Sequence, residues 1–185
     1  MLNPVSAQDR TRWDQRYTRG TPLTPADVAV PAPFSRFAEM FPTSGHALDL
    51  ACGRGLSAIW LAQRGMSVFG LDISPVAIAD ARDLAQRCGV DQQCRFEVTD
   101  LDGGLPPGPP AEVIVCHMFR DPRLDRAILQ RLVPGGLLAV SALSEVGAHP
   151  GPFRVRADEL ETAFAALEVI AAGAGDGTAW LLGRR

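Results

Sequence analysis

The stretch ALDLACGRGLS, residues 47–57, constrains the fold of this chain more than any other segment. It begins apolar, carries an acid at Asp49, and then becomes glycine-rich before a helical pattern starts at Leu56. Gly53 and Gly55 supply the backbone freedom of a tight turn and let a ligand come close to the main chain. The first N–H groups of the helix would point toward such a ligand, because they lack partners within the helix. The stretch predicts a strand, a turn and a helix that form a nucleotide-binding site.

Strand patterns and helix patterns alternate from His46 to the end of the chain, which predicts parallel βαβ units with right-handed crossovers. The last two strands are joined by the glycine-rich AGAGDGT, which is too short to hold a crossover helix, so we expect them to pair antiparallel. Ser74 is expected to cap a helix that begins at Pro75. The expected strands are 46–50, 67–71, 94–98, 112–116, 137–143, 168–172 and 179–183. The expected helices are 6–19, 34–41, 56–64, 75–88, 122–132 and a segment around 160–167.

Composition excludes several classes of function. The chain has 185 residues and a net charge of −3, and all of its 18 basic residues are arginine. The charge argues against a nucleic-acid partner, because binding to phosphates requires a concentrated positive patch. The absence of lysine excludes Schiff-base chemistry and a P-loop, both of which need a lysine amine. The four cysteines form no CxxC pair, so we expect no metal site.

The hydropathy pattern predicts a cytoplasmic protein without a membrane partner. No apolar run is long enough to span a bilayer, and the first residues lack the apolar core of a signal peptide. The pattern indicates nothing about the oligomeric state.

One interpretation of the glycine turn is a dinucleotide site. Gly53-x-Gly55-x-x-Ala58 fits the loose form of the NAD-type fingerprint, and Asp72 follows Gly53 by nineteen residues at the end of the next strand. An NAD-type oxidoreductase is therefore one alternative.

A second interpretation accounts for more of the sequence. LDLACGRG resembles motif I of the class I S-adenosylmethionine-dependent methyltransferases, and VFGLDIS, FEVTDL and RLVPGGLLAVS resemble the segments around their next strands. These pieces cover residues 46–185 in the order of that family. Ala51 is a departure, because the family more often has glycine there. The resemblance implies a three-layer, Rossmann-like α/β sandwich with a seven-stranded, mostly parallel sheet of order 3-2-1-4-5-7-6, in which strand 7 is antiparallel.

The resemblance also implies a role for each acid at a strand end. Asp72 would accept hydrogen bonds from the two ribose hydroxyls of S-adenosylmethionine. Asp100 would meet the adenine edge, and Asp49 would face the methionine ammonium. Each acid has an alternative role, since an aspartate at a strand end often only caps the next turn. The expected cofactor-binding positions of the core are Asp49, Ala51, Gly53, Gly55, Asp72, Ile73, Asp100, Leu101 and Cys116.

The amino-terminal WDQRYTRGTPL is similar to the lid helix of small-molecule methyltransferases of the tellurite-resistance and thiopurine type. By that resemblance Trp13, Arg16 and Tyr17 line the closed site, and Arg16 is a candidate partner for the cofactor carboxylate. The alternative is an amphipathic helix whose aromatic residues pack on the sheet. We expect a single methyltransferase domain over residues 1–185, with the lid in 1–42 and the cofactor-binding core in 43–185.

The segment CHMFRD, residues 116–121, follows the fourth strand and is expected near the transferred methyl group, because ligands bind at the carboxyl ends of strands in open α/β sheets. His117 could act as a base toward the acceptor or could form a hydrogen bond in the pocket wall. The sequence leaves little length for a substrate domain. We therefore expect methyl transfer to a small molecule, with a non-catalytic S-adenosylmethionine-binding protein as a further alternative. The acceptor atom stays open.

Overall fold

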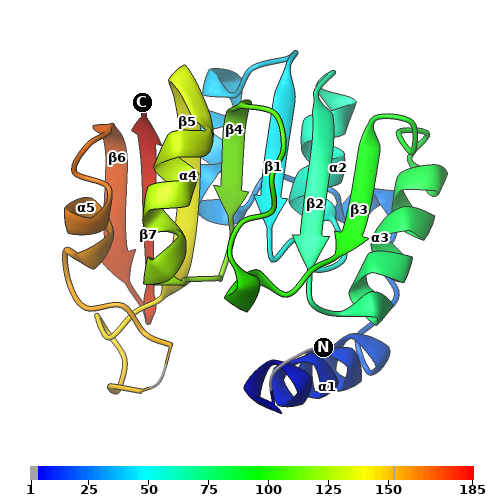
Figure 1. The fold of residues 1–185 in the computed structure, drawn as a ribbon, viewed down its shortest axis with the longest axis horizontal. Helices are drawn as coiled ribbons and strands as arrows, with labels where there is room; N and C mark the ends of the chain where they lie inside the picture. The colour runs from blue at the N-terminus through cyan, green and yellow to red at the C-terminus, as the bar shows by residue number, and fades with distance from the viewer. Residues whose placement is uncertain (1–3, 152) are drawn as a thin grey trace.

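The computed structural model describes residues 4–151 and 153–185, which form one seven-stranded sheet of order β3-β2-β1-β4-β5-β7-β6 (Figure 1). This confirms the expected strand order. The parallel strands reproduce the predicted ranges within a residue at each end, except for β5, which begins earlier. The bounds are β1 His46–Leu50, β2 Ser67–Asp72, β3 Cys94–Val98, β4 Ala111–Cys116, β5 Leu132–Leu143, β6 Glu168–Gly175 and β7 Thr178–Arg184.

The strand β7 pairs antiparallel with both β5 and β6, as predicted, while the other paired strands are parallel. The link between β6 and β7 is shorter than expected, because only Asp176 and Gly177 separate the two strands. Both residues have positive φ, 49° and 76°. A two-residue loop of Asp and Gly with positive φ at both positions matches the right-handed twist of a hairpin. Residues 173–175, which were expected in the loop, therefore belong to β6.

Three helical predictions needed adjustment. The stretch expected as a helix at 34–41 is a 3₁₀ segment, Ala32–Met40, and the helix expected at 122–132 begins with a 3₁₀ turn at Pro122–Leu124. The fourth helix ends at Arg131, because Leu132 already pairs with Ala111 and extends β5. The last helix is short. The α-helices are α1 Pro4–Thr18, α2 Leu56–Gln63, α3 Pro75–Arg87, α4 Asp125–Arg131 and α5 Glu159–Ala163, and the other 3₁₀ turns are Pro25–Asp27 and Leu101–Gly103.

The sheet has an apolar core on each face. The α2 and α3 side contains Ile59, Ile78 and Phe96, together with Phe34 from the amino-terminal segment. The α4 and α5 side contains Leu48, Ile128 and Phe164, among others. Successive side chains of a strand point to opposite faces. Asp49 therefore projects to the α2 side, like Ala47, while Leu48 and Leu50 pack on the other side.

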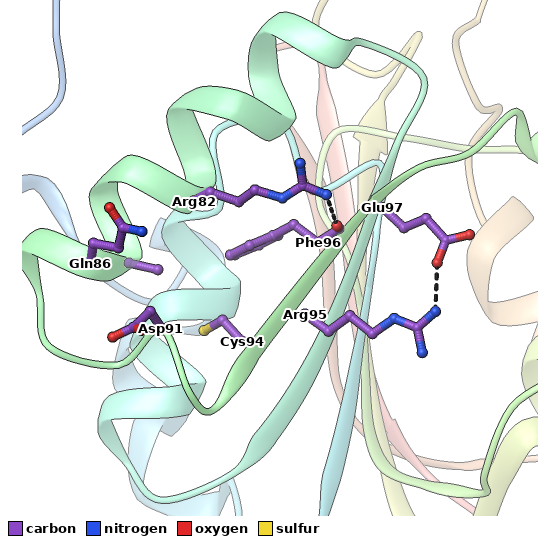
Figure 2. Close-up of a pocket in the computed structure, with 8 residues that line it drawn as sticks. Arg82, Gln86, Asp91, Cys94, Arg95, Phe96 and Glu97 are labelled. Carbon is purple, nitrogen blue, oxygen red and sulfur yellow. Dashed lines mark hydrogen bonds and ion pairs between the residues drawn. The ribbon is translucent and has the colours of Figure 1, made fainter.

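One of the two edge strands of the sheet, β3, is protected by arginine side chains (Figure 2). Gln93 accepts a hydrogen bond from Val68 through its carbonyl, so the alternation of the strand places the Phe96 carbonyl on the free edge. The Arg82 guanidinium of α3 donates to that carbonyl over 2.5 Å, and Arg95 pairs with Glu97 at 2.8 Å. Charged side chains on an edge strand hinder pairing with a second chain.

Within the described residues, no helix combines the length and the apolar character needed to cross a membrane.

Candidate functional site

The carboxyl ends of β1, β2, β3 and β4 meet at one edge of the sheet, and α1 lies across this edge (Figure 1). In a parallel sheet the loop after each strand leaves from the carboxyl end, and the chain re-enters the next strand from the amino end. The loops that follow these four strands therefore gather at the carboxyl ends. The glycine turn follows β1, Asp72 ends β2, Asp100 follows β3, and His117 follows β4. The topology therefore brings together residues that are far apart in the sequence.

The turn after β1 requires left-handed backbone at three positions. Ala51 has φ 52°, Gly53 has φ 52° and Gly55 has φ 80°. Only glycine adopts this region without a steric penalty. The conformation of Ala51 explains in physical terms why the methyltransferase family more often has glycine there. Gly55 is also enclosed, because a Cβ atom at this position would lie 2.9 Å from Cβ of Ala81 and 3.1 Å from the ring of Phe96.

We expect Gly55→Ala to lower the free energy of unfolding by about 2–5 kcal/mol, as the sum of left-handed strain and overpacking. Gly89→Ala is a matched control, because Gly89 also has positive φ, 69°, but nothing lies within 4 Å of its added Cβ. That variant should lose only the strain contribution, about 1–2 kcal/mol. Urea unfolding of the two variants measures the difference. Equal losses would show that the contact of the turn with α3 and β3 contributes nothing.

Asp49 is a buried acid with an unsatisfied oxygen. Its side chain is 2% exposed, and within the described residues its Oδ2 has no hydrogen-bond partner. Burial raises the pKa of the carboxyl group to about 8, the backbone N–H of Ala58 acts in the opposite direction, and the charge of Asp72 raises the pKa further. An isolated buried carboxylate is costly. The site therefore favours a positively charged group or a hydrogen-bond donor beside Asp49.

Asp72 connects two turns through its carboxylate. Oδ2 accepts a hydrogen bond from the Gly53 N–H at 2.8 Å, and Oδ1 accepts one from the Ser74 N–H at 2.9 Å. Burial raises the pKa of this carboxyl group, and the two N–H donors counteract the rise. A carboxylate has about four lone-pair sites, so it can still accept hydroxyl donors. Both the turn-forming role and the ligand-binding role are compatible with this geometry.

Ser74 caps α3, as the sequence predicted, because its Oγ accepts a hydrogen bond from the Ala77 N–H at 3.1 Å. The same hydroxyl donates to Oδ1 of Asp14 over 2.5 Å. This contact fastens α1 to the edge of the sheet beside Asp72. Asp14 and the second role of Ser74 were missed in the sequence, although Asp14 lies three residues before Tyr17 on the same helical face.

Tyr17 of α1 packs on the glycine turn, and Trp13 stacks on Tyr17. The rings of Trp13 and Tyr17 are stacked with centroids 5.7 Å apart. A Cβ at Gly53 would lie 3.0 Å from the Tyr17 hydroxyl, a tight contact, and the φ of 52° also favours glycine at this position. Burial raises the pKa of Tyr17 well above its usual range, and the negative charge of Asp72 adds to the rise. The Arg16 guanidinium lies over the Trp13 ring at 5.4 Å, and its residue is exposed.

The residues after β3 form a 3₁₀ turn, Leu101–Gly103. Oδ1 of Asp100 accepts from the Asp102 N–H at 3.0 Å, so Asp100 caps the 3₁₀ turn that follows. Leu101 is buried, and Ile73 is half-buried beside Asp72. The turn-forming alternative for Asp100 is thus observed for one of its two oxygens.

The loop after β4 is held by Ser141 of β5. Nδ1 of His117 lies 2.6 Å from Oγ of Ser141, and the Met118 N–H donates to the same oxygen at 3.1 Å. Burial lowers the pKa of His117. Cys116 is buried, and burial raises the pKa of its thiol. Ser141 was missed in the sequence, although a serine within the apolar run LLAVSAL is a signal of a buried polar contact.

Arg120 does not face the site that the sequence suggested for it. Its guanidinium pairs with both oxygens of Asp125, at 2.5 and 2.9 Å, and lies 5.6 Å from the ring centroid of Phe164. The side chain is therefore directed toward α4 and α5, because these contacts provide the charge and the packing that a buried guanidinium needs.

The donor set at this edge fits S-adenosylmethionine. The oxygen of Asp49 that lacks a partner among the described residues would meet the methionine ammonium, and the carboxylate of Asp72 keeps lone pairs for the ribose hydroxyls. Within the described residues, no group of three or more His, Cys, Asp and Glu side chains could hold a metal ion. The hollow in Figure 2 is a separate feature between α3 and β3, and none of the predicted site residues lines it.

Comparison with known proteins supports the same interpretation. The family described as "Methyltransferase domain" matches residues 47–136. A ribosomal protein L11 methyltransferase of Vibrio cholerae is 36% identical over 110 residues, which are 58% of this chain and 36% of that protein. The chain thus spans about a third of the length of this curated relative.

Two solved structures share the fold across most of the chain. TehB from Haemophilus influenzae has a TM-score of 0.75 at 18% identity, covering 94% of this chain and 67% of its own. Magnesium protoporphyrin IX methyltransferase from Synechocystis PCC 6803, with bound S-adenosylmethionine, has a TM-score of 0.71 at 17% identity and covers 100% and 97%. Methyltransferases are enzymes, and the second of these structures contains the methyl donor S-adenosylmethionine. Residues 47–136 therefore match a methyltransferase family model, and the strand order and the glycine turn are those expected from the resemblance to the class I S-adenosylmethionine-dependent methyltransferases.

Proposed function

We propose that this protein transfers the methyl group of S-adenosylmethionine to a small-molecule acceptor at the edge formed by β1, β2 and β4. The observation that carries the proposal is Asp49, a buried acid with an oxygen that lacks a partner among the described residues, beside the glycine turn. An NAD-type cofactor would bring a pyrophosphate to this turn, and a pyrophosphate carries neither a positive charge nor a hydrogen-bond donor for the free oxygen of Asp49.

Each residue then has a defined task. Asp49 would pair with the methionine ammonium, Asp72 with the ribose hydroxyls, and the turn at Asp100 and Leu101 with the adenine edge. S-adenosylmethionine supplies the methyl group on a sulfonium, which is already a good leaving group. The protein would therefore mainly orient the acceptor and exclude water.

The position of α1 supports a small acceptor. Asp14 holds this helix to Ser74, and Tyr17 lies on Gly53, so the helix covers the edge where the cofactor would lie. A covered site suits a small molecule better than a folded protein. The curated relative acts on ribosomal protein L11 by its name, and it matches over about a third of its length. Methylation of a ribosomal protein is therefore the second candidate.

The cofactor is tested by thermal shift with S-adenosylmethionine, S-adenosylhomocysteine and NADH in parallel. Ligand at about a hundred times its Kd adds about 2.7 kcal/mol of stability, which is about 5–10 °C for a domain of this size. We expect this shift with both adenosyl ligands and none with NADH. A shift with NADH alone would overturn the assignment and revive the oxidoreductase.

Turnover is tested by release of S-adenosylhomocysteine with a panel of small carboxylates, phenols, thiols and amines, and with ribosomal protein L11. Product with a small acceptor supports the proposal. Product with the protein alone would establish the second candidate. Cofactor binding without turnover on any of these would favour the non-catalytic alternative. The cytoplasmic location and the lack of a nucleic-acid partner stay predictions.

A further inference from the structure

Ser141 is a buried polar residue in an otherwise apolar strand, and it holds three successive residues of the β4 loop. The side chain is 1% exposed. Its hydroxyl contacts Nδ1 of His117 at 2.6 Å and accepts the Met118 N–H at 3.1 Å, while its backbone carbonyl accepts the Phe119 N–H at 3.2 Å. One residue of β5 thus sets the position of the whole segment.

The available donors and acceptors decide which atom donates in the hydrogen bond between Ser141 and His117. The Met118 N–H can only donate, so it cannot receive the proton of the Ser141 hydroxyl. A buried hydroxyl proton needs an acceptor. Among the described residues, the remaining side-chain partner of this hydroxyl is Nδ1 of His117. Ser141 therefore donates to Nδ1, and the neutral imidazole carries its own proton on Nε2.

The Nε2 side of the ring is reachable from solvent. The buried side-chain nitrogen and oxygen atoms that lack a hydrogen bond, within the described residues, belong to Asp49, Arg64 and Arg120. His117 is half-buried, and its Nε2 is neither in that group nor hydrogen-bonded to another described residue. The ring thus presents an N–H at the edge of the sheet.

The backbone beside His117 gives a second indication of a built site. Met118 has φ 56°, a left-handed conformation that costs a non-glycine residue about 1–2 kcal/mol. The hydrogen bond from its N–H to Ser141 holds it there. Strain of this kind persists where surrounding contacts over-determine the backbone, and it clusters at functional sites.

We propose that Ser141 is a positioning residue that keeps His117 in the Nε2–H form, so that His117 is a hydrogen-bond donor to an acceptor substrate with a carboxylate. The inference rests on the proposed methyl transfer, because it assigns the acceptor at that site.

The chemistry of the donor selects the acceptor. Nε2 already carries a proton, so His117 cannot take one from a substrate, and the acceptor must arrive with a nucleophilic lone pair and with a second atom that accepts the Nε2–H. A carboxylate meets this requirement at neutral pH. One of its oxygens attacks the methyl carbon while the other accepts the Nε2–H. The O–C bond forms, the S–C bond breaks with its electron pair left on sulfur, and no proton moves. The products are a methyl ester and S-adenosylhomocysteine.

The tautomer is tested by NMR of the full chain with ¹⁵N-labelled histidine, with the three histidines assigned by substitution. We expect wild-type His117 to be neutral at pH 7 with its proton on Nε2. In Ser141→Ala the pKa of His117 should rise, because a hydrogen bond to the neutral form is lost. Ser141→Thr, which keeps the hydroxyl, should restore the wild-type tautomer and pKa. A proton on Nδ1, or a fall of the pKa in Ser141→Ala, would overturn the proposal.

The ligand is tested on the S-adenosylhomocysteine complex with benzoate and phenol as matched probes. We expect benzoate to shift the Nε2 resonance of His117 and to bind at least tenfold more tightly than phenol. His117→Gln keeps an N–H donor but no base, so it should retain benzoate binding, and His117→Ala should lose it. Equal binding of the two probes would contradict a carboxylate acceptor. If S-adenosylhomocysteine itself fails to bind, the proposed function fails, while the tautomer measurement still decides the role of Ser141.

Discussion

Replacing Asp72 with alanine should weaken the binding of S-adenosylhomocysteine at least about a hundredfold. The carboxylate would make two charge-assisted hydrogen bonds to the ribose hydroxyls, each contributing about 1.5–3 kcal/mol, and 1.4 kcal/mol corresponds to a factor of ten. The same carboxylate orders the site before binding, because it accepts the N–H groups of Gly53 and Ser74. Isothermal titration calorimetry measures the Kd directly.

Two further variants separate binding from folding. Asp72→Asn keeps the side-chain volume but not the charge, so it should weaken binding less than alanine does while staying folded. Gly89→Ala strains the chain at the far end of α3, where the structure has no predicted site residue, and should leave the Kd unchanged. If Asp72→Ala binds S-adenosylhomocysteine as tightly as the wild type, Asp72 is only a turn-forming residue.

The ligand-free protein should lose stability as the pH rises from about 4 to about 8, and Asp49→Asn should remove much of this loss. The pKa of Asp49 is raised by burial from 3.8 to about 8. Between these values the folded state holds a proton that the unfolded state has released, so the free energy of unfolding falls with increasing pH. One pKa unit corresponds to about 1.4 kcal/mol, so the largest loss expected from this group is about 6 kcal/mol.

The measurement is urea unfolding of the wild type, Asp49→Asn and Asp83→Asn across this pH range. Asp83 is an exposed acid that pairs with Arg87 on the surface of α3, so its variant should follow the wild-type slope. Asp72 contributes in the same direction in all three proteins, because burial raises its pKa as well. Identical slopes for the wild type and Asp49→Asn would show that Asp49 is ionised in the folded protein throughout.

Ionisation of Asp49 should also change ligand affinity, and in the opposite direction to its effect on stability. An ionised Asp49 attracts the methionine ammonium, so the affinity for S-adenosylhomocysteine should increase as the pH rises toward 8. The increase should be absent in Asp49→Asn.

Local signals in the chain were sufficient to predict the elements of the fold. Ser74 before Pro75 marked the start of α3, and the alternation of strand and helix patterns implied parallel β1 to β5. The ends of β6 and β7 were less accurate because the Asp176-Gly177 turn was not recognised within a longer glycine-rich stretch. Burial pattern and turn chemistry are properties of a few neighbouring residues, so they are visible in the sequence.

The position of each candidate site residue at a strand end could also be predicted, because parallel strands bring their carboxyl ends to one edge. The partners of these residues could not. Asp14 meets Ser74 across sixty positions, and His117 meets Ser141 across twenty-four. Such contacts depend on where α1 crosses the edge and on the register of β4 with β5, which no local pattern encodes. The sequence therefore identified the acids and the histidine as candidates. The packing of distant elements decided that Oδ2 of Asp49 lacks a partner among the described residues, that Asp14 of α1 binds Ser74, and how His117 is oriented.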